Sequence, residues 1–138
     1  MLTVRSASLR RCVLPLAAFL TLPLVGCGMG SPDITGRVIN GPGSVVMGVD
    51  PADPRLKQDG IPAANIVVRK YAGEGATGAI VASGVSTEKG EFKVPLSDID
   101  AQKFELVLTA TTPDKRISKG RFFMHGGKPI LVVVREGN

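Results

Sequence analysis

Cysteine, tryptophan, tyrosine and histidine are scarce in this chain of 138 residues, and their scarcity excludes several kinds of protein. The two cysteines are Cys12 and Cys27, the single tyrosine is Tyr71, the single histidine is His125, and tryptophan is absent. Because no cysteine follows Cys27, the rest of the chain offers neither a disulfide nor a cysteine-based metal site. Zinc hydrolysis needs two or three histidine or carboxylate ligands held together, and a lone histidine in a turn does not supply them. We therefore expect no catalytic residue, no metal site and no cofactor.

A concentrated basic face is also missing, although the formal net charge is +5. Three of the seventeen basic residues precede residue 12, which leaves fourteen beside twelve acidic residues. The only loose basic cluster consists of Lys115, Arg116, Lys119 and Arg121. A nucleic-acid-binding protein concentrates such residues to displace counterions from phosphates. We therefore expect no nucleic-acid partner, and we interpret the cluster as the solvated face of a strand pair.

Residues 1–26 have the organisation of an export signal. Three arginines (Arg5, Arg10 and Arg11) precede an uncharged apolar stretch from Val13 to Val25. This stretch has about 13 residues, whereas a membrane-spanning helix needs roughly 20. Pro15 and Pro23 also disfavour a permanent transmembrane helix. We predict that residues 1–26 direct export and are then removed.

The residues Leu24-Val25-Gly26-Cys27 resemble the lipobox of bacterial lipoproteins. This resemblance implies that the Cys27 thiol receives a diacylglyceryl group, that the signal is cut before Cys27, and that the new amine is acylated. Each buried methylene contributes about 0.8 kcal/mol, so two or more acyl chains give stable membrane residence. Residues 27–32 would form the lipidated cysteine and a short tether. Gly28, in place of the aspartate linked with inner-membrane retention, favours the outer membrane. We expect an exported lipoprotein, anchored at the periplasmic face of that membrane or at the cell surface.

From residue 34 onward, short runs of alternating apolar and polar residues are separated by turn residues, a pattern that predicts β-strands. No segment has a helix-length period of 3.6 residues. In the clearest strand, Phe104, Leu106 and Leu108 are expected to face the core, as is Phe92 in an earlier one. The expected strands are 34–40, 64–71, 79–83, 91–96, 104–110, 116–125 and 129–135. Seven such strands indicate an all-β sandwich or barrel.

The segment 41–60 interrupts this rhythm with three prolines, four glycines and three aspartates. A loop near 20 residues within a compact domain is often functional or mobile, although Val45 to Val49 could add a short edge strand. Its aspartates could offer oxygen ligands to calcium. Their spacing matches no calcium-binding loop, and Pro51 and Pro54 favour turn initiation instead. The three aspartates are Asp50, Asp53 and Asp59.

Four segments in order resemble the carboxypeptidase regulatory-like domain, a transthyretin-like, seven-stranded Greek-key sandwich. They are 34–38 (ITGRV), 61–68 (IPAANIVV), 87–92 (TEKGEF) and 104–108 (FELVL). In the third segment Gly90 can adopt the positive φ that closes a tight hairpin. The resemblance covers about residues 33–112, within a domain that we place at 33–138. The sequence departs from the family in its long first loop and in Ala63, where glycine is common.

The resemblance implies a non-catalytic role, because in carboxypeptidases this domain accompanies the zinc-binding catalytic domain. Transthyretin-like hydroxyisourate hydrolases use a second histidine that this chain lacks. Two hypotheses remain. The first is a structural or protein-binding role, with sheet edges and the 41–60 segment as contact surfaces. The second is a module that binds polysaccharide or a small apolar molecule, for which Tyr71 and the outward member of the Phe122-Phe123 pair are candidate contacts. A groove beside an exposed aromatic residue would favour the second hypothesis.

Overall fold

A computed structural model describes residues 32–124 and 127–137, and within these ranges the chain is all-β, as predicted. None of its described helices is long and apolar enough to cross a membrane. Two short 3-10 helices, η1 (Pro54–Lys57) and η2 (Ile99–Lys103), lie between strands. The strands are β1 (Asp33–Gly41), β2 (Val45–Gly48), β3 (Asn65–Lys70), β4 (Ile80–Val85), β5 (Glu91–Pro95), β6 (Leu106–Thr111), β7 (Ile117–Phe122) and β8 (Ile130–Arg135).

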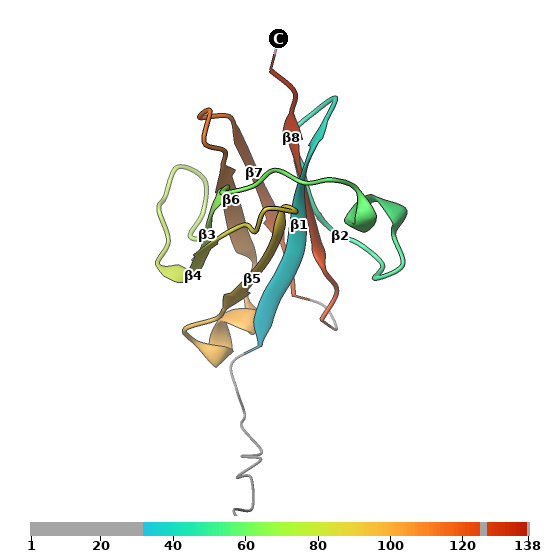
Figure 1. Cartoon of the computed structure of the whole chain (residues 1–138). Coiled ribbons are helices and arrows are strands. Elements are labelled where there is room, and N and C mark those ends of the chain that lie inside the picture. The colour runs from blue at the N-terminus through green and yellow to red at the C-terminus, as the bar shows by residue number, and fades with distance from the viewer. Residues whose placement is uncertain (1–31, 125–126, 138) are drawn as a thin grey trace, which may run out of the picture. The chain divides into compact units, whose positions relative to one another are not determined.

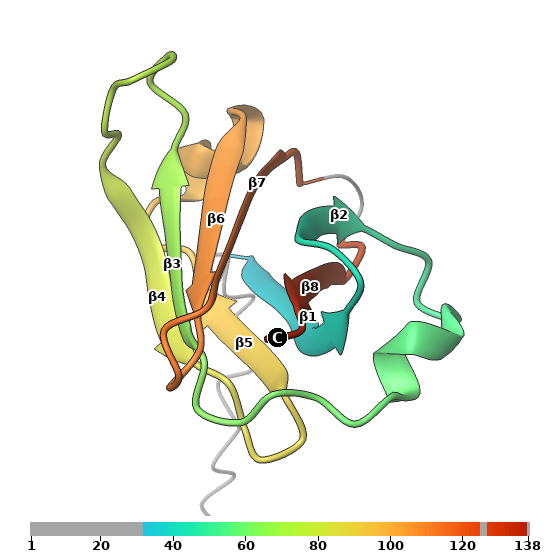
Figure 2. The ribbon, with the colours of Figure 1, turned by 90° about the horizontal axis from the view of Figure 1, so that it is seen from above.

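The strands form two four-stranded sheets that face each other (Figures 1 and 2). One sheet has the order β2-β8-β1-β5 and the other β4-β3-β6-β7. The β1–β8 pair is parallel, and the other pairs are antiparallel. The described residues thus contain eight strands rather than the seven expected. The additional strand is β2, which pairs with β8 at the sheet edge, where the sequence allowed an extra strand.

The core between the sheets follows the predicted alternation on most strands. Ile66 and Val68 of β3 are fully buried, as are Leu106 and Leu108 of β6, and Phe92 of β5 is also in the core. Burying a side chain of this size contributes roughly 1.5–3 kcal/mol, so the inward rows supply much of the stability.

The prediction that Phe104 faces the core is wrong, because its side chain is half exposed. Strand β6 begins at Leu106, two residues later than expected. Phe104 instead ends η2, and its backbone N–H donates a hydrogen bond to the carbonyl oxygen of Ala101 (3.1 Å). The turn of η2 therefore removes Phe104 from the alternation of the strand.

Two glycines allow the edges of the opposing sheets to approach each other. A Cβ atom on Gly120 of β7 would lie 2.7 Å from Cβ of Val46 in β2. A Cβ atom on Gly84 of β4 would lie 2.5 Å from a methyl group of Val94 in β5. Since real Cβ atoms do not approach so closely, both positions need glycine, and the two open sides of the sandwich are narrowed.

The 41–60 segment is folded onto the outer face of the β2-β8-β1 sheet. Leu131 and Val133 of β8 and Ile39 of β1 form a second buried cluster there, against which Leu56 of η1 packs. The Asp53 side chain caps η1 by accepting a hydrogen bond from the backbone N–H of Arg55 (2.9 Å). Strand β8 is therefore covered on both faces.

Two of the turn residues with a positive φ bear on the sequence predictions. Gly90 has φ 80°, which confirms the backbone conformation predicted for it. The predicted hairpin is wrong, because this turn joins β4 to β5, which belong to different sheets and are not paired. Ala63 has φ 55°, in the left-handed region that favours glycine. Ala63 therefore adopts a backbone conformation that a glycine would adopt with less strain.

Candidate functional site

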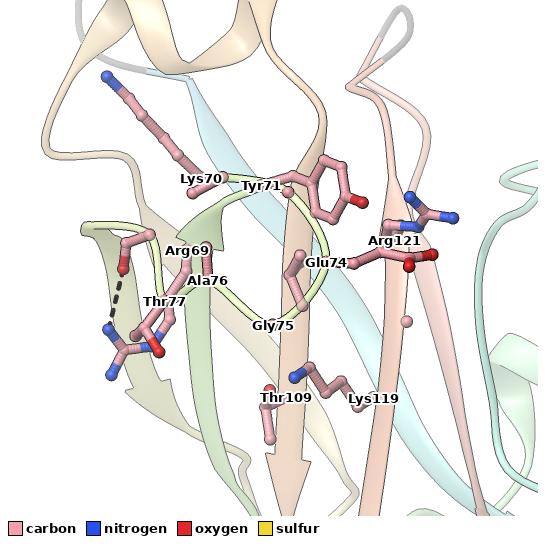
Figure 3. Close-up of a pocket in the computed structure, with 15 residues that line it drawn as sticks. Arg69, Lys70, Tyr71, Glu74, Gly75, Ala76, Thr77, Thr109, Lys119 and Arg121 are labelled. Atoms are coloured by element: carbon pink, nitrogen blue, oxygen red, sulfur yellow. Dashed lines mark hydrogen bonds between the residues drawn. The ribbon is translucent and has the colours of Figure 1, made fainter.

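A hollow of about 630 Å³ lies on the outer face of the β3-β6-β7 sheet, at the end of β3 (Figure 3). It is bounded by the loop 71–79, which joins β3 to β4. We call it the 71–79 hollow. Its lining side chains outside the loop are Arg69, Lys70, Val107, Thr109, Lys119 and Arg121.

The pairing of three strands brings the basic side chains of the 71–79 hollow together. Arg69 of β3 is opposite Val107 of β6, which is opposite Arg121 of β7. In another row Thr109 of β6 is opposite Lys119 of β7. Directly opposed residues on one face have Cβ atoms about 4.5–5.5 Å apart, so the cations of β3 and β7 flank the strand between them.

The loop 71–79 is positioned by backbone hydrogen bonds. At its start, the N–H of Tyr71 donates to the carbonyl oxygen of Glu105 (2.9 Å). At its end, Lys70 N–H donates to the carbonyl oxygen of Ala79 (3.0 Å), and the Arg69 guanidinium donates to that of Gly78 (3.0 Å). Because both ends are held to the strands, the loop forms a defined wall of the hollow.

Positive charge is only partly compensated at the 71–79 hollow. Lys70 pairs with Asp98 (3.2 Å) and Arg121 with Glu105 (3.6 Å). The Arg69 guanidinium is bonded to a neutral carbonyl, and the Lys119 ammonium has no ion pair or hydrogen bond within the described residues. Glu74 is the single carboxylate among the lining residues. The site is therefore suited to an anionic ligand.

The aromatic residue at the 71–79 hollow is Tyr71. The guanidinium carbon of Arg121 lies 4.7 Å from the centre of its ring, a cation–π contact. One ring face is therefore covered, and the residue is only partly exposed. Tyr71 thus helps to orient Arg121, and both residues line the hollow.

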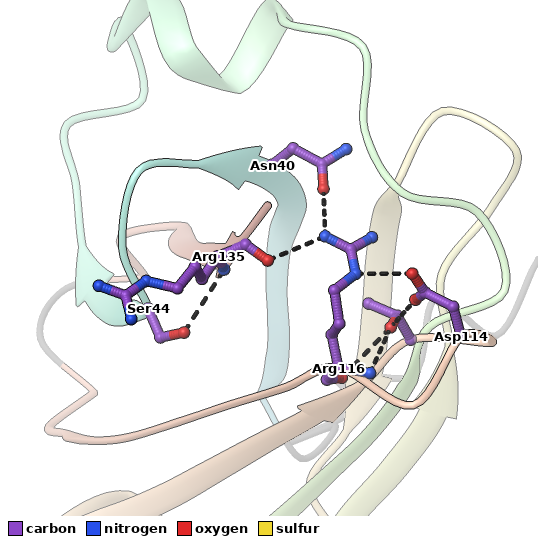
Figure 4. Close-up of polar contacts among 6 residues, drawn as sticks. Asn40, Ser44, Asp114, Arg116 and Arg135 are labelled. Atoms are coloured by element: carbon purple, nitrogen blue, oxygen red, sulfur yellow. Dashed lines mark hydrogen bonds and ion pairs between the residues drawn. The ribbon is translucent and has the colours of Figure 1, made fainter. Parts of the chain in front are cut away.

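The predicted basic cluster divides between two roles. Lys119 and Arg121 line the hollow, whereas Arg116 connects the β6–β7 turn to the other sheet (Figure 4). Its guanidinium donates to the side-chain oxygen of Asn40 (2.8 Å), to the backbone oxygen of Arg135 (2.9 Å) and to the carboxylate of Asp114 (2.7 Å). The interpretation of Arg116 as part of a merely solvated face is therefore wrong.

The Asp114 carboxylate should make stability depend on pH. Its pKa is lowered from the ordinary 3.8, first by a hydrogen bond from the Thr112 hydroxyl and then by one from Arg116. The ionised form therefore stabilises the fold above the ordinary pKa, and this contribution is lost as pH falls through the lower, folded-state pKa. We expect Asp114→Asn to lower the unfolding temperature at pH 7 and the difference to narrow below pH 4. An equal decrease at both pH values in thermal unfolding would contradict this.

The other predicted site residues have mixed outcomes. Cys27 and His125 lie outside the described residues. Phe122 is buried and Phe123 half exposed, which confirms that one of the pair faces outward. Within ranges 32–124 and 127–137, no group of three or more histidine, cysteine or acidic side chains could hold a metal ion. Asp50 accepts a hydrogen bond from Ala52 N–H (2.8 Å), which confirms its role in a turn.

Three of the four edge strands, β4, β5 and β2, carry features that hinder the addition of a further strand. Ser97 covers part of the β4 edge, because its N–H and its hydroxyl both donate to the carbonyl oxygen of Val81 (2.7 and 3.0 Å). Strand β5 carries exposed Lys93 and Pro95, and β2 has only four residues. Charges, proline and short length all protect edges. These edges are therefore weaker candidates for a binding surface than the 71–79 hollow.

Comparison with known proteins assigns this chain to no family. No protein-family model, curated protein or solved structure matches the chain. The residues of the hollow, together with the two resemblances in the sequence, are thus the observations that bear on function.

Proposed function

We propose that this chain is a lipid-anchored, non-catalytic binding domain of the cell envelope, and that it binds an acidic polysaccharide in the 71–79 hollow. The observation that carries the proposal is the pair of uncompensated cations, Arg69 and Lys119, on either side of β6 in a hollow large enough for a ligand. Hydrogen bonds between charged groups are about twice as strong as those between neutral groups, which favours carboxylate or sulfate substituents.

Several observations favour an acidic glycan over the alternatives. Val107 is the single large aliphatic side chain in the lining, which disfavours a small apolar molecule. The hydroxyl groups of Thr77, Thr109 and Tyr71 add hydrogen-bonding groups suited to sugar hydroxyls. The protection of the edge strands β4, β5 and β2 disfavours a protein partner that adds a strand there. The second of the two sequence hypotheses is therefore preferred, in its polysaccharide form.

The anchor belongs to the same proposal. Residues 1–26 would be removed on export, Cys27 would be lipidated, and residues 27–32 would tether a transthyretin-like, carboxypeptidase regulatory-like domain, 33–138. The two facing sheets and the left-handed Ala63 support this family assignment. Gly28 favours placement at the outer membrane.

A charge reversal tests the binding site. Lys119→Glu should weaken binding of the soluble domain 33–138 to an acidic glycan such as polygalacturonate, because it replaces an attractive charge with a repulsive one. The expected loss of affinity is more than about tenfold, which corresponds to about 1.4 kcal/mol. Lys89→Glu is the matched control, since Lys89 is exposed in the turn between β4 and β5 and does not line the hollow. Titration calorimetry at low and high salt measures the affinities, which should fall with salt.

Three results would count against the proposal. Equal weakening by the two variants would indicate a diffuse charge effect, and tight binding of neutral dextran would remove the role of the cations. Stronger binding of polyglutamate than of polygalacturonate would point to an acidic protein partner instead.

A further inference from the structure

The end of the domain at which the tether enters is formed by several segments. The N–H of Leu96 donates to the carbonyl oxygen of Pro32 (3.2 Å), and Asp33 is paired with Pro95. Asp33 and Ile34 also line a small depression with the end of β7 and the start of β8. We call this surface the tether end. It comprises residues 32–34, 95–104, 122–124 and 127–130.

The tether end carries large apolar side chains that the fold does not bury. Ile99 of η2 is 42% exposed, and Phe104 and Phe123 are each 50% exposed. Lys70 holds Phe104 close to Asp98, because its ammonium contacts both the Asp98 carboxylate (3.2 Å) and the Phe104 ring (5.1 Å to its centre). An aromatic ring beside a lysine is a combination suited to a membrane interface.

Within the described residues, phenylalanine is exposed only at the tether end. At the opposite end of the β3-β6-β7 sheet the exposed large apolar residues are Val85 and Ile117, which are paired with Asn65 and Thr111. The two ends thus differ in the kind of apolar side chain that they present to solvent.

The length of the tether limits where the domain can lie. Five residues separate Cys27 from Asp33, and a fully extended chain spans at most about 3.6 Å per residue, so the domain begins within about 20 Å of the lipidated cysteine. We propose that the tether end rests on the lipid bilayer, with Phe104 and Ile99 in the headgroup region. This inference rests on the proposed lipidation of Cys27.

Charge at the tether end is nearly balanced, so apolar contact is the main attraction. Lys103 pairs with Asp100 (3.2 Å) and Lys93 with Asp33 (3.4 Å). With few uncompensated charges, the contact should form on zwitterionic phosphatidylcholine and should change little with salt. This orientation of the domain would also place the 71–79 hollow close to the membrane surface, because the loop of the hollow follows Lys70.

The absence of tryptophan allows a clean test, because a single introduced indole reports alone. The full chain with Phe104→Trp, purified from membranes and reconstituted in phosphatidylcholine vesicles, should show blue-shifted emission. It should also show at least about twofold stronger quenching by brominated lipid than the matched variant Ile117→Trp. Ile117 is 59% exposed on β7, at the opposite end of the sheet.

The outcomes separate the anchor from the orientation. Vesicle flotation with lipid quenching confined to the Phe104→Trp variant supports the inference. Flotation with equal, weak quenching in both variants overturns the orientation and leaves the anchor in place. A blue shift in the Phe104→Trp variant without lipid quenching also overturns it, because a protein contact would then cover this surface. Failure of the chain to float would overturn the anchor, and the orientation with it.

Discussion

Replacement of Cys27 by alanine is expected to release the protein from the membrane fraction completely and to abolish incorporation of labelled palmitate. The thiol is the proposed attachment point for the diacylglyceryl group, and alanine cannot form the thioether. Without acyl chains, each buried methylene contribution of about 0.8 kcal/mol is lost, and the apolar residues of the tether end alone cannot sustain stable residence. Metabolic labelling followed by fractionation measures both effects.

Cys12→Ala provides the matched control, because Cys12 is the other cysteine and lies within the proposed signal. This variant should retain both the label and the membrane fraction. Unchanged labelling of the Cys27→Ala chain would refute the anchor, and loss of label in both variants would indicate failed export rather than loss of the attachment site.

Truncation of Leu131 to alanine is expected to destabilise the domain by about 2–5 kcal/mol, the usual cost for a buried leucine. Leu131 is fully buried in the outer cluster, which includes Leu56 of η1 as a packed neighbour. Its burial depends on the 41–60 segment covering that face of the sheet. Chemical unfolding of the domain 33–138 measures the change in free energy.

Leu131→Met is the control, because a swap of similar volume usually costs less than about 1.5 kcal/mol. A loss below about 1 kcal/mol for Leu131→Ala would mean that the outer face of β8 is open to solvent. The 41–60 segment would then be a free loop, as its glycine and proline content first suggested.

Most strands could be predicted because alternation is a local signal. Val68 and Leu108 follow it, since each lies in a strand with one face on the core. The prediction for Phe104 was wrong because the alternating pattern of β6 extends toward the N-terminus to the end of η2. There the backbone forms a turn, which the Asp98 side chain caps. The run 130–134 (ILVVV) carries no alternation, and this agrees with burial on both faces, which the covering segment provides.

The candidate site could not be predicted from the sequence, because it depends on which strands become neighbours. Arg69 and Lys119 are 50 positions apart and are brought to one surface by the pairing of β3 and β7 with β6. The sequence contained two partial signals: basic residues at alternating strand positions and the glycine-rich loop after Tyr71. Only the registers of the strands join them into one hollow.

Ligand binding at the 71–79 hollow is tested most directly by a titration of the isotope-labelled domain 33–138 with short oligogalacturonates, followed by amide chemical shifts. We predict that the largest shifts occur in residues 71–79 and at Lys119 and Arg121, because these residues line the hollow. Shifts concentrated on β2 or β5, or no shifts at millimolar ligand, would contradict the account.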